Sequence, residues 1–320
     1  MFRPGWGSTF HDGSREREAL VGGFRTWRGL CAALSAVVLS VLFAPGAAVA
    51  STGTKTWTAH GLTYVAQTGF VAHQSQAGTT ASCPAGRFVV GGGLRIKGAF
   101  ANNATVNSIE GASSPGWIGY AQNEGSADLT TIAYAICTVP VPDYVSATTA
   151  NLPAVGGLSS AVSHCPSGET ILDGAVNITG DYTAHVDLTG NISKSQDDPF
   201  PDDAWVGEGH NRGAQPQTLS VSAICDDQAK VYPHRAFDVP PMSQKTVKVP
   251  CPRHTTVTGG GALDAALTTE AQLGGAIASS VPYALKRGAV PDKGWAVTVR
   301  NGGSDTLDVV ALAVCERFFA

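Results

Sequence analysis

The sequence lacks the short motifs that identify many enzymes and metal proteins. It contains no C-x-x-C pair and no H-E-x-x-H segment, which are ligand spacings of common zinc sites. It has no G-x-S-x-G turn, the element that presents the nucleophile in many serine hydrolases. No Lys-Ser or Lys-Thr pair follows its glycine clusters, so a phosphate-binding loop is not indicated. We therefore expect no bound cofactor.

Charged residues are scarce as well, at 14% of the chain. The first 50 residues hold five basic and three acidic side chains, so the remaining 270 carry 16 and 22 and a net charge of −6. Nucleic acids and anionic membranes attract a positive surface, and this balance argues against both as partners. Abundant Gly, Ser, Thr, Ala and Val instead favour many short strands joined by tight turns.

The beginning of the chain has the pattern of an export signal. Arg25 and Arg28 precede an apolar run over residues 30–43, and Ala-Val-Ala follows at 48–50. This order predicts cleavage before Ser51. The run is shorter than the ~20 residues of a spanning helix, so we expect no membrane span after cleavage. The sequence thus predicts a secreted protein, extracellular or associated with the cell wall.

The rest of the chain contains three copies of one pattern. Each copy opens with Cys-Pro, passes through a glycine-rich segment to a Trp and an Asn, and closes on a second Cys. Trp to Asn is 6 residues and Trp to the closing Cys is 20 in every copy. The copies, called units 1, 2 and 3, have Cys83, Trp117, Asn123 and Cys137; Cys165, Trp205, Asn211 and Cys225; and Cys251, Trp295, Asn301 and Cys315. After a signal peptide with an extended N-region over 1–50, we place the units at 51–140, 141–228 and 229–320.

The Trp segment alternates as a half-buried strand does. In unit 3, Trp295, Val297 and Val299 share one face, while Thr298 and Arg300 share the other. Each Trp strand ends at Asn-x-Gly, and both residue types tolerate the positive φ of a tight turn. We therefore predict a hairpin between the Trp strand and the Cys strand. The Cys strand is apolar on both faces, which indicates an interior strand.

A glycine stands nine residues after each opening cysteine, at Gly92, Gly174 and Gly260. A Gly within an apolar strand indicates a bulge or a close approach of backbone, here over the Trp of the same unit. These features predict an all-β protein of three tandem disulfide-closed β repeats, arranged as a β-prism with a pseudo-threefold axis. Tandem small β-sandwiches are the alternative.

The six cysteines of the units pair in one of 15 ways. Equivalence between the units and an oxidising location favour one disulfide in each unit. The expected pairs are Cys83–Cys137, Cys165–Cys225 and Cys251–Cys315. Zinc is the competing interpretation, but no cluster of Cys and His ligands supports it. We expect structural disulfides and no metal.

The combination of Cys-Pro-x-Gly, Gly-Gly-Gly, Trp and Ala-Ile-Cys resembles a repeat of uncharacterised secreted actinobacterial proteins. The resemblance covers residues 83–315 and implies location and fold more than activity. Unit 3 departs from it with His254, where the other units have Gly86 and Gly168. A looser likeness, in short motifs alone, is to the vitelline membrane outer layer protein. That likeness implies a β-prism of three Greek-key sheets.

The aromatic residues offer two kinds of candidate. The three unit tryptophans either pack in the core or present platforms to sugar rings, and their apolar strand neighbours favour the core. Other aromatics at non-equivalent positions are candidates for lining a groove. They are Trp57, Tyr120, Tyr182 and Tyr283.

Acidic and basic side chains gather near Trp205. Asp197, Asp198, Asp202 and Asp203 form an acidic loop, which is a weak candidate for Ca²⁺ because it lacks the D-x-D-x-D-G spacing. Glu208 and His210 share the outward face of the Trp strand in unit 2 and form a weak catalytic candidate. Neither has a counterpart in the other units.

Three functions follow as hypotheses. The first is a non-catalytic secreted binding or cell-surface protein whose variable loops bind an extracellular glycan or protein. These loops are the segments 99–114, 180–203 and 266–293, where the units differ in length. The second is a secreted hydrolase that uses the Glu208/His210 region. The third is a structural coat or matrix component.

Overall fold

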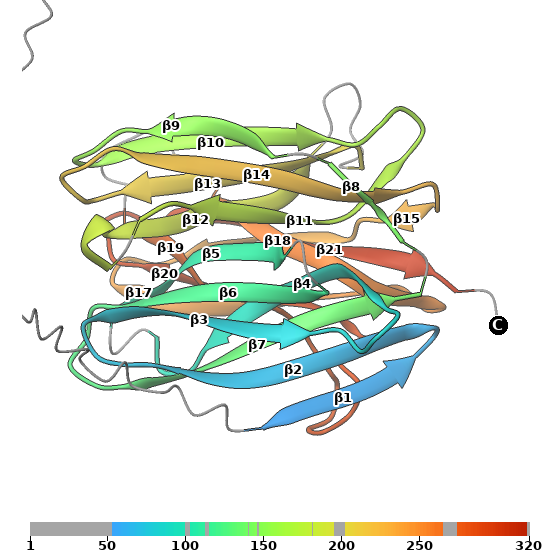
Figure 1. Ribbon diagram of the computed structural model, residues 1–320. Coiled ribbons are helices and arrows are strands. Elements are labelled where there is room, and N and C mark those ends of the chain that lie inside the picture. The colour runs from blue at the N-terminus through green and yellow to red at the C-terminus, as the bar shows by residue number, and fades with distance from the viewer. Residues whose placement is uncertain are drawn as a thin grey trace, which may run out of the picture. The chain divides into compact units, whose positions relative to one another are not determined.

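The computed structural model describes residues 53–99, 103–112, 115–139, 141–145, 147–180, 182–194, 202–264 and 274–318. The chain divides into two parts, residues 1–47 and 48–320, and every described residue belongs to the second part. The expected signal peptide therefore lies outside the described residues. Within them the fold is all-β (Figure 1), with one short 3-10 turn at Tyr182–Ala184. The described residues contain no helix of sufficient length and hydrophobicity to cross a bilayer.

The strands form three antiparallel sheets of seven strands each. Sheet A has the order β1 (Thr54–Ala59), β2 (Leu62–Val71), β7 (Leu129–Thr138), β4 (Phe88–Ile96), β19 (Gly275–Pro282), β20 (Gly294–Asn301) and β17 (Ser243–Pro250). Sheet B has β3 (Ser75–Ser82), β6 (Gly116–Asn123), β5 (Ala104–Ala112), β11 (Thr170–Ile178) and β14 (Gln217–Asp226), with β8 (Asp143–Tyr144) and β9 (Thr148–Leu152) both on β14. Sheet C has β10 (Gly157–His164), β13 (Ala204–Asn211), β12 (Val186–Lys194), β18 (Thr255–Asp264) and β21 (Leu307–Arg317), with β15 (Lys230–Val231) and β16 (His234–Val239) both on β21.

Each sheet combines strands from two units. Unit 1 contributes β1, β2, β7 and β4 to sheet A, and β3, β6 and β5 to sheet B. Unit 2 is divided in the same way between sheets B and C, and unit 3 between sheets C and A. The two halves of a unit pack face to face, so each unit is a two-layer sandwich. The shared sheets join the three sandwiches in a closed ring. The all-β, three-part prediction is confirmed.

The tryptophans fill the space between the two layers of each unit. Trp117, Trp205 and Trp295 are all 0% exposed. A Cβ atom added to Gly92 would lie 2.4 Å from Cγ of Trp117, on the strand of the facing sheet. Corresponding distances are 2.1 Å from Gly174 to Trp205 and 2.5 Å from Gly260 to Trp295. Both the predicted burial of Trp and the predicted close approach of Gly are confirmed.

The strand that carries this glycine bulges in every unit. The register shifts between Val89 and Gly91 in unit 1, and at the equivalent residues of the other units. A Cβ on Gly91 would lie 2.0 Å from the carbonyl oxygen of Thr258, which belongs to unit 3. The bulges of different units therefore meet at the centre of the ring, and at Gly91 only the smallest residue fits between the backbones.

The disulfides close the expected pairs, Cys83–Cys137, Cys165–Cys225 and Cys251–Cys315. In unit 1, Cys83 directly follows β3 of sheet B, while Cys137 lies in β7 of sheet A. The chain passes from one layer to the other at this point. Each disulfide thus ties the crossover to the central Cys strand, which limits the freedom of the unfolded chain.

The predicted hairpin at Asn-x-Gly is wrong. β6, which carries Trp117, pairs with β3 and β5, whereas β7 pairs with β2 and β4 of another sheet. None of the three Asn-x-Gly segments has a positive φ at its Asn or at the Gly in its third position. The asparagines instead act through their side chains. Asn301 Nδ2 donates to the carbonyls of Val239 and Asp305, and its Oδ1 accepts from the amide of Gly303.

The segments expected to be variable loops contain structural strands. β5 lies within 99–114, β12 within 180–203 and β19 within 266–293. Each of these strands pairs with the glycine strand of another unit, as β19 does with β4. The segments differ in length between units only before and after these strands, because each strand lies in the interior of a sheet and is paired on both sides. An exchange of whole segments between units would therefore disturb the joints of the ring.

Candidate functional site

A cleft of about 480 Å³ lies on the outer face of sheet A. All seven strands of this sheet contribute to its lining, and so does the segment between β19 and β20. That segment extends to the far edge of the sheet, where the indole Nε1 of Trp57 on β1 donates to the carbonyl of Gly288 at 3.1 Å. In Figure 1 the orange-red segment passes close to β1. The cleft is therefore shared by unit 1 and unit 3.

Three aromatic side chains line the cleft from three separate segments. Trp57 lies on β1, Tyr134 on β7 and Tyr283 directly after β19, and each is half-buried. Burial raises the pKa of both tyrosines, although Arg95 partly offsets this effect at Tyr134. Both phenols are therefore neutral hydrogen-bonding groups at physiological pH. Such residues present an apolar face and a polar edge to a ligand.

Six cationic side chains also line the cleft, and its described lining includes no Asp or Glu. They are Lys55, Arg95, Lys97, Lys248, Lys286 and Arg287. The Nζ atom of Lys248 lies 5.1 Å from the ring centroid of Tyr283, within the range of a cation–π contact. The cleft is thus both aromatic and strongly positive, in a chain whose net charge is negative.

The equivalent outer positions of the other sheets carry no such charge. Tyr134 lies three residues before its closing cysteine, where the other units have Ser222 and Leu312. Arg95 lies three residues after Gly92, where the other units have Asn177 and Leu263. Lys248 lies three residues before its opening cysteine, where the others have Thr80 and Val162.

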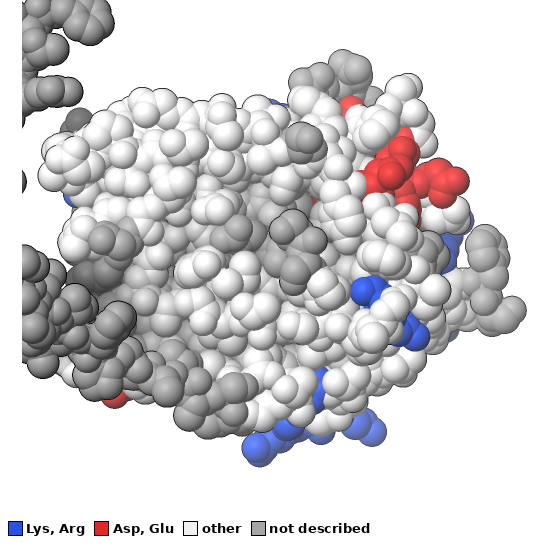
Figure 2. Space-filling view, viewed as in Figure 1, with Lys and Arg blue, Asp and Glu red and all other residues white. Residues whose placement is uncertain are grey.

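Figure 2 shows the surface over one of these other sheets, sheet B. The broad area over β14, β11, β5 and β6 of sheet B is almost free of charged atoms. The red patch lies near β8, where Glu169 faces the carboxylates of Asp143, Asp226 and Asp227. Since the scaffold residues are shared while these outer residues are not, the charge on sheet A is not a requirement of the fold.

The catalytic candidates do not form an acid/base site in a cleft. Glu208 lines a hollow of about 200 Å³ on sheet C with Leu158, Ser159 and Ser160, and no second carboxylate lines it among the described residues. His210 was expected on an exposed face but is only 3% exposed. It lies on the interior strand β13, opposite Leu158 of β10 and Asp187 of β12.

The acidic loop near Trp205 is described only in part. Asp197 and Asp198 lie outside the described residues. The backbone carbonyls of Asp202 and Asp203 accept hydrogen bonds from the amides of Ile171 and Cys165, both at 2.8 Å. These contacts hold the crossover of unit 2. No group of three or more metal-binding side chains occurs among the described residues.

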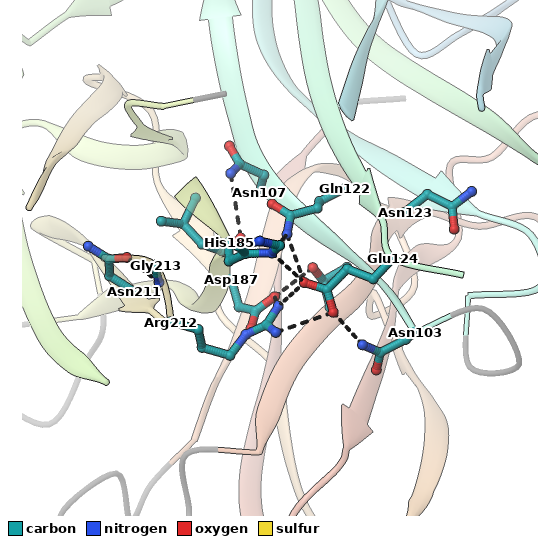
Figure 3. Close-up of polar contacts among 12 residues, drawn as sticks. Asn103, Asn107, Gln122, Asn123, Glu124, His185, Asp187, Asn211, Arg212 and Gly213 are labelled. Atoms are coloured by element: carbon teal, nitrogen blue, oxygen red, sulfur yellow. Dashed lines mark hydrogen bonds and ion pairs between the residues drawn. The ribbon is translucent and has the colours of Figure 1, made fainter. Parts of the chain in front are cut away.

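A second polar cluster joins units 1 and 2 (Figure 3). The guanidinium of Arg212 bridges Glu124, at 2.6 Å, and Asp187, at 2.7 Å. Glu124 also accepts from Nε2 of Gln122 and contacts Nδ1 of His185. Burial tends to raise the pKa of Glu124, but Arg212, His185 and Gln122 together lower it. Because each charge has its partner inside the protein, this cluster stabilises the joint rather than awaiting a ligand.

Comparison of the sequence with models of protein families and with the curated proteins found no match. The function must therefore be argued from the cleft itself. Sequence reasoning identified Trp57 and Tyr283 as groove candidates, and both line the cleft. Tyr120 lies on β6 of sheet B, and the side chain of Tyr182 is outside the described residues. The cations were missed because they come from separate segments that only the sheet brings together.

Proposed function

We propose that this protein is a non-catalytic secreted binding protein that holds an extracellular glycan in the cleft on sheet A. The observation that carries the proposal is the convergence of Trp57, Tyr134 and Tyr283 around one concave surface. A sugar ring has an apolar C–H face that packs on an aromatic side chain, and hydroxyl groups that need polar partners nearby. The cleft offers both.

Hydroxyl side chains on the floor of the cleft support a sugar ligand. Thr68, Thr246, Ser279 and Thr298 come from four strands of sheet A and line the same surface as the aromatic residues. Each hydroxyl both donates and accepts, which suits the hydroxyl groups of a sugar. The floor is therefore polar and hydrogen-bonding, while the aromatic groups supply contact area.

Export belongs to the same proposal. Three disulfides fit an oxidising compartment, because the cytosol keeps thiols reduced. The signal-like leader with cleavage before Ser51 provides the route. A glycan of the cell wall or of the surroundings is then the accessible ligand.

Binding of the purified protein to an array of neutral and acidic glycans tests this function. Trp57→Ala and Tyr283→Ala should each weaken binding about tenfold or more, as loss of an aromatic anchor does. Tyr120→Ala is the matched control, because it removes a half-buried aromatic from sheet B, outside the cleft. Retained binding in both cleft variants, or equal loss in the control, would refute the assignment to the cleft.

A further inference from the structure

We propose that the ligand of the sheet A cleft is an acidic glycan, a polysaccharide segment that carries carboxylate or phosphate groups. This inference rests on the proposed function, because it assigns a chemical class to the ligand of the same site. It is carried by the cations rather than by the aromatic residues.

The cations surround the aromatic residues on several sides. Lys55 comes from β1, Arg95 from β4 and Lys248 from β17, while Lys286 and Arg287 lie on the segment that extends to β1. These five side chains are exposed. A ligand lying on Trp57 and Tyr283 would therefore meet positive charge along its length.

Within the described part of the chain, these cations form no internal ion pairs. None of the six has a carboxylate partner among the described residues, in contrast to Arg212, Lys230 and Lys293, which each pair with an acid. Six like charges around one concave surface repel each other, and concave walls of low dielectric constant strengthen their field. An anionic ligand relieves this repulsion, whereas a neutral one leaves it in place.

The arrangement favours a short acidic glycan segment over a nucleic acid. The cleft has a limited volume of about 480 Å³, which matches a compact ligand rather than a long duplex. The chain after residue 50 has a net charge of −6, so a long polyanion is repelled by the rest of the surface. A few carboxylates or phosphates on sugar rings satisfy the cations, the hydroxyls and the aromatic faces together.

The inference is tested with two polymers of the same sugar backbone, polygalacturonate and its fully methyl-esterified form. We expect the carboxylated polymer to bind and the ester to bind at least about tenfold more weakly, because the ester lacks charge for the cations. Raising the ionic strength from about 0.01 M to about 1 M shortens the Debye length from roughly 30 to 3 Å and should weaken binding of the acidic form strongly. Poly(glycerol phosphate) in a parallel arm distinguishes phosphate from carboxylate as the preferred group.

Substitutions to the residues of the other units test whether the cations of the cleft cause the preference for the acidic polymer. Arg95→Asn and Lys248→Thr introduce the residues found at the equivalent positions of units 2 and 1, so the scaffold tolerates them. The double variant should bind the acidic polymer about tenfold more weakly and with a shallower salt dependence. The control is the double variant Arg235→Gln and Arg253→Gln, which removes two exposed cations outside the cleft and should leave binding unchanged.

The outcomes separate the inference from the function on which it rests. Equal binding of the ester and the acid, with no effect of salt, would overturn the inference and leave a neutral glycan as ligand. Binding of neither polymer, together with no glycan on the array, would overturn the function and the inference together. Tighter binding to a single-stranded DNA oligonucleotide than to any acidic glycan would overturn the choice of ligand class.

Discussion

Asp173 occupies the point where the three units meet. Units 1 and 3 have Gly91 and Gly259 at this position, and a Cβ on Gly259 would lie 2.5 Å from Cγ of Asp173. The centre thus has room for one side chain. Asp173 is 1% exposed, and its Oδ2 accepts from the amide of Gly92 at 2.9 Å. Burial raises the pKa of Asp173 well above its usual range, although the amides of Gly92, Gly174 and Gly260 oppose this effect.

This pKa shift predicts how stability depends on pH. A group whose folded-state pKa is raised stabilises the fold fully below its unfolded pKa, about 4 for Asp, and the contribution is lost as pH rises through the folded pKa. Asp173→Asn keeps an acceptor for Gly92 and cannot ionise. We expect this variant to be about 1–3 kcal/mol more stable than the parent at neutral pH. Its free energy of unfolding should also change less than that of the parent as the pH rises from 4. Urea unfolding at several pH values measures this.

The control for this experiment is Asp173→Gly, the residue of the other two units. It also abolishes the titration, but it leaves a cavity at the centre and should gain less stability than the Asn variant. An Asn variant that is less stable than the parent at neutral pH would show that the carboxylate stabilises the centre.

At the level of elements, the asparagine turns hold strands of different sheets together. Asn123, Asn211 and Asn301 are each fully buried and bond the chain at the same two places. One is the turn that each Asn begins, and the other is the point where the second strand of its unit ends, before the third strand. A buried side chain that satisfies three backbone groups cannot be shortened without leaving them unpaired.

Asn301→Ala should therefore destabilise the protein by about 2–4 kcal/mol, since it leaves the carbonyls of Val239 and Asp305 and the amide of Gly303 without this partner. Chemical denaturation measures the loss. Asn301→Asp retains the acceptor for Gly303 but places a buried carboxylate oxygen against the two carbonyls, so it should cost at least as much stability as the Ala variant. A cost below about 0.5 kcal/mol for Ala, the range of ordinary surface changes, would contradict this role.

The elements also show where prediction from sequence ends. The equal spacings found the cysteine pairs, the buried tryptophans and the glycines beside them, because these depend on contacts within one unit. The predicted pairing of β6 with β7 was wrong. Consecutive strands usually pair, but these two lie in facing sheets. The cleft was found only in part, since its cations come from both ends of the chain and share no local pattern.

At the level of the whole molecule, the ring makes the units depend on each other. Strands β4 and β19 join units 1 and 3, β11 and β5 join units 2 and 1, and β18 and β12 join units 3 and 2. The Arg212 cluster adds a polar joint between units 1 and 2. Removal of any unit exposes the inner strands of two sheets, which are unpaired edges.

Thermal unfolding with intact disulfides should therefore be one cooperative transition, with the calorimetric and van't Hoff enthalpies in agreement. Residues 229–320 alone, which hold unit 3, should fail to fold. Three separate transitions, or a folded isolated unit, would show that the units are independent sandwiches.

The central claim, that ligand binds in the sheet A cleft, is tested most directly by the fluorescence of Trp57. Residues 51–320 contain four tryptophans, of which Trp57 is half-buried and Trp117, Trp205 and Trp295 are 0% exposed. Acrylamide should thus quench Trp57 selectively, and a bound acidic glycan should protect it in a saturable way. Trp57→Phe should remove both the quenching and the protection. Binding detected by calorimetry without any protection of Trp57 would contradict the account.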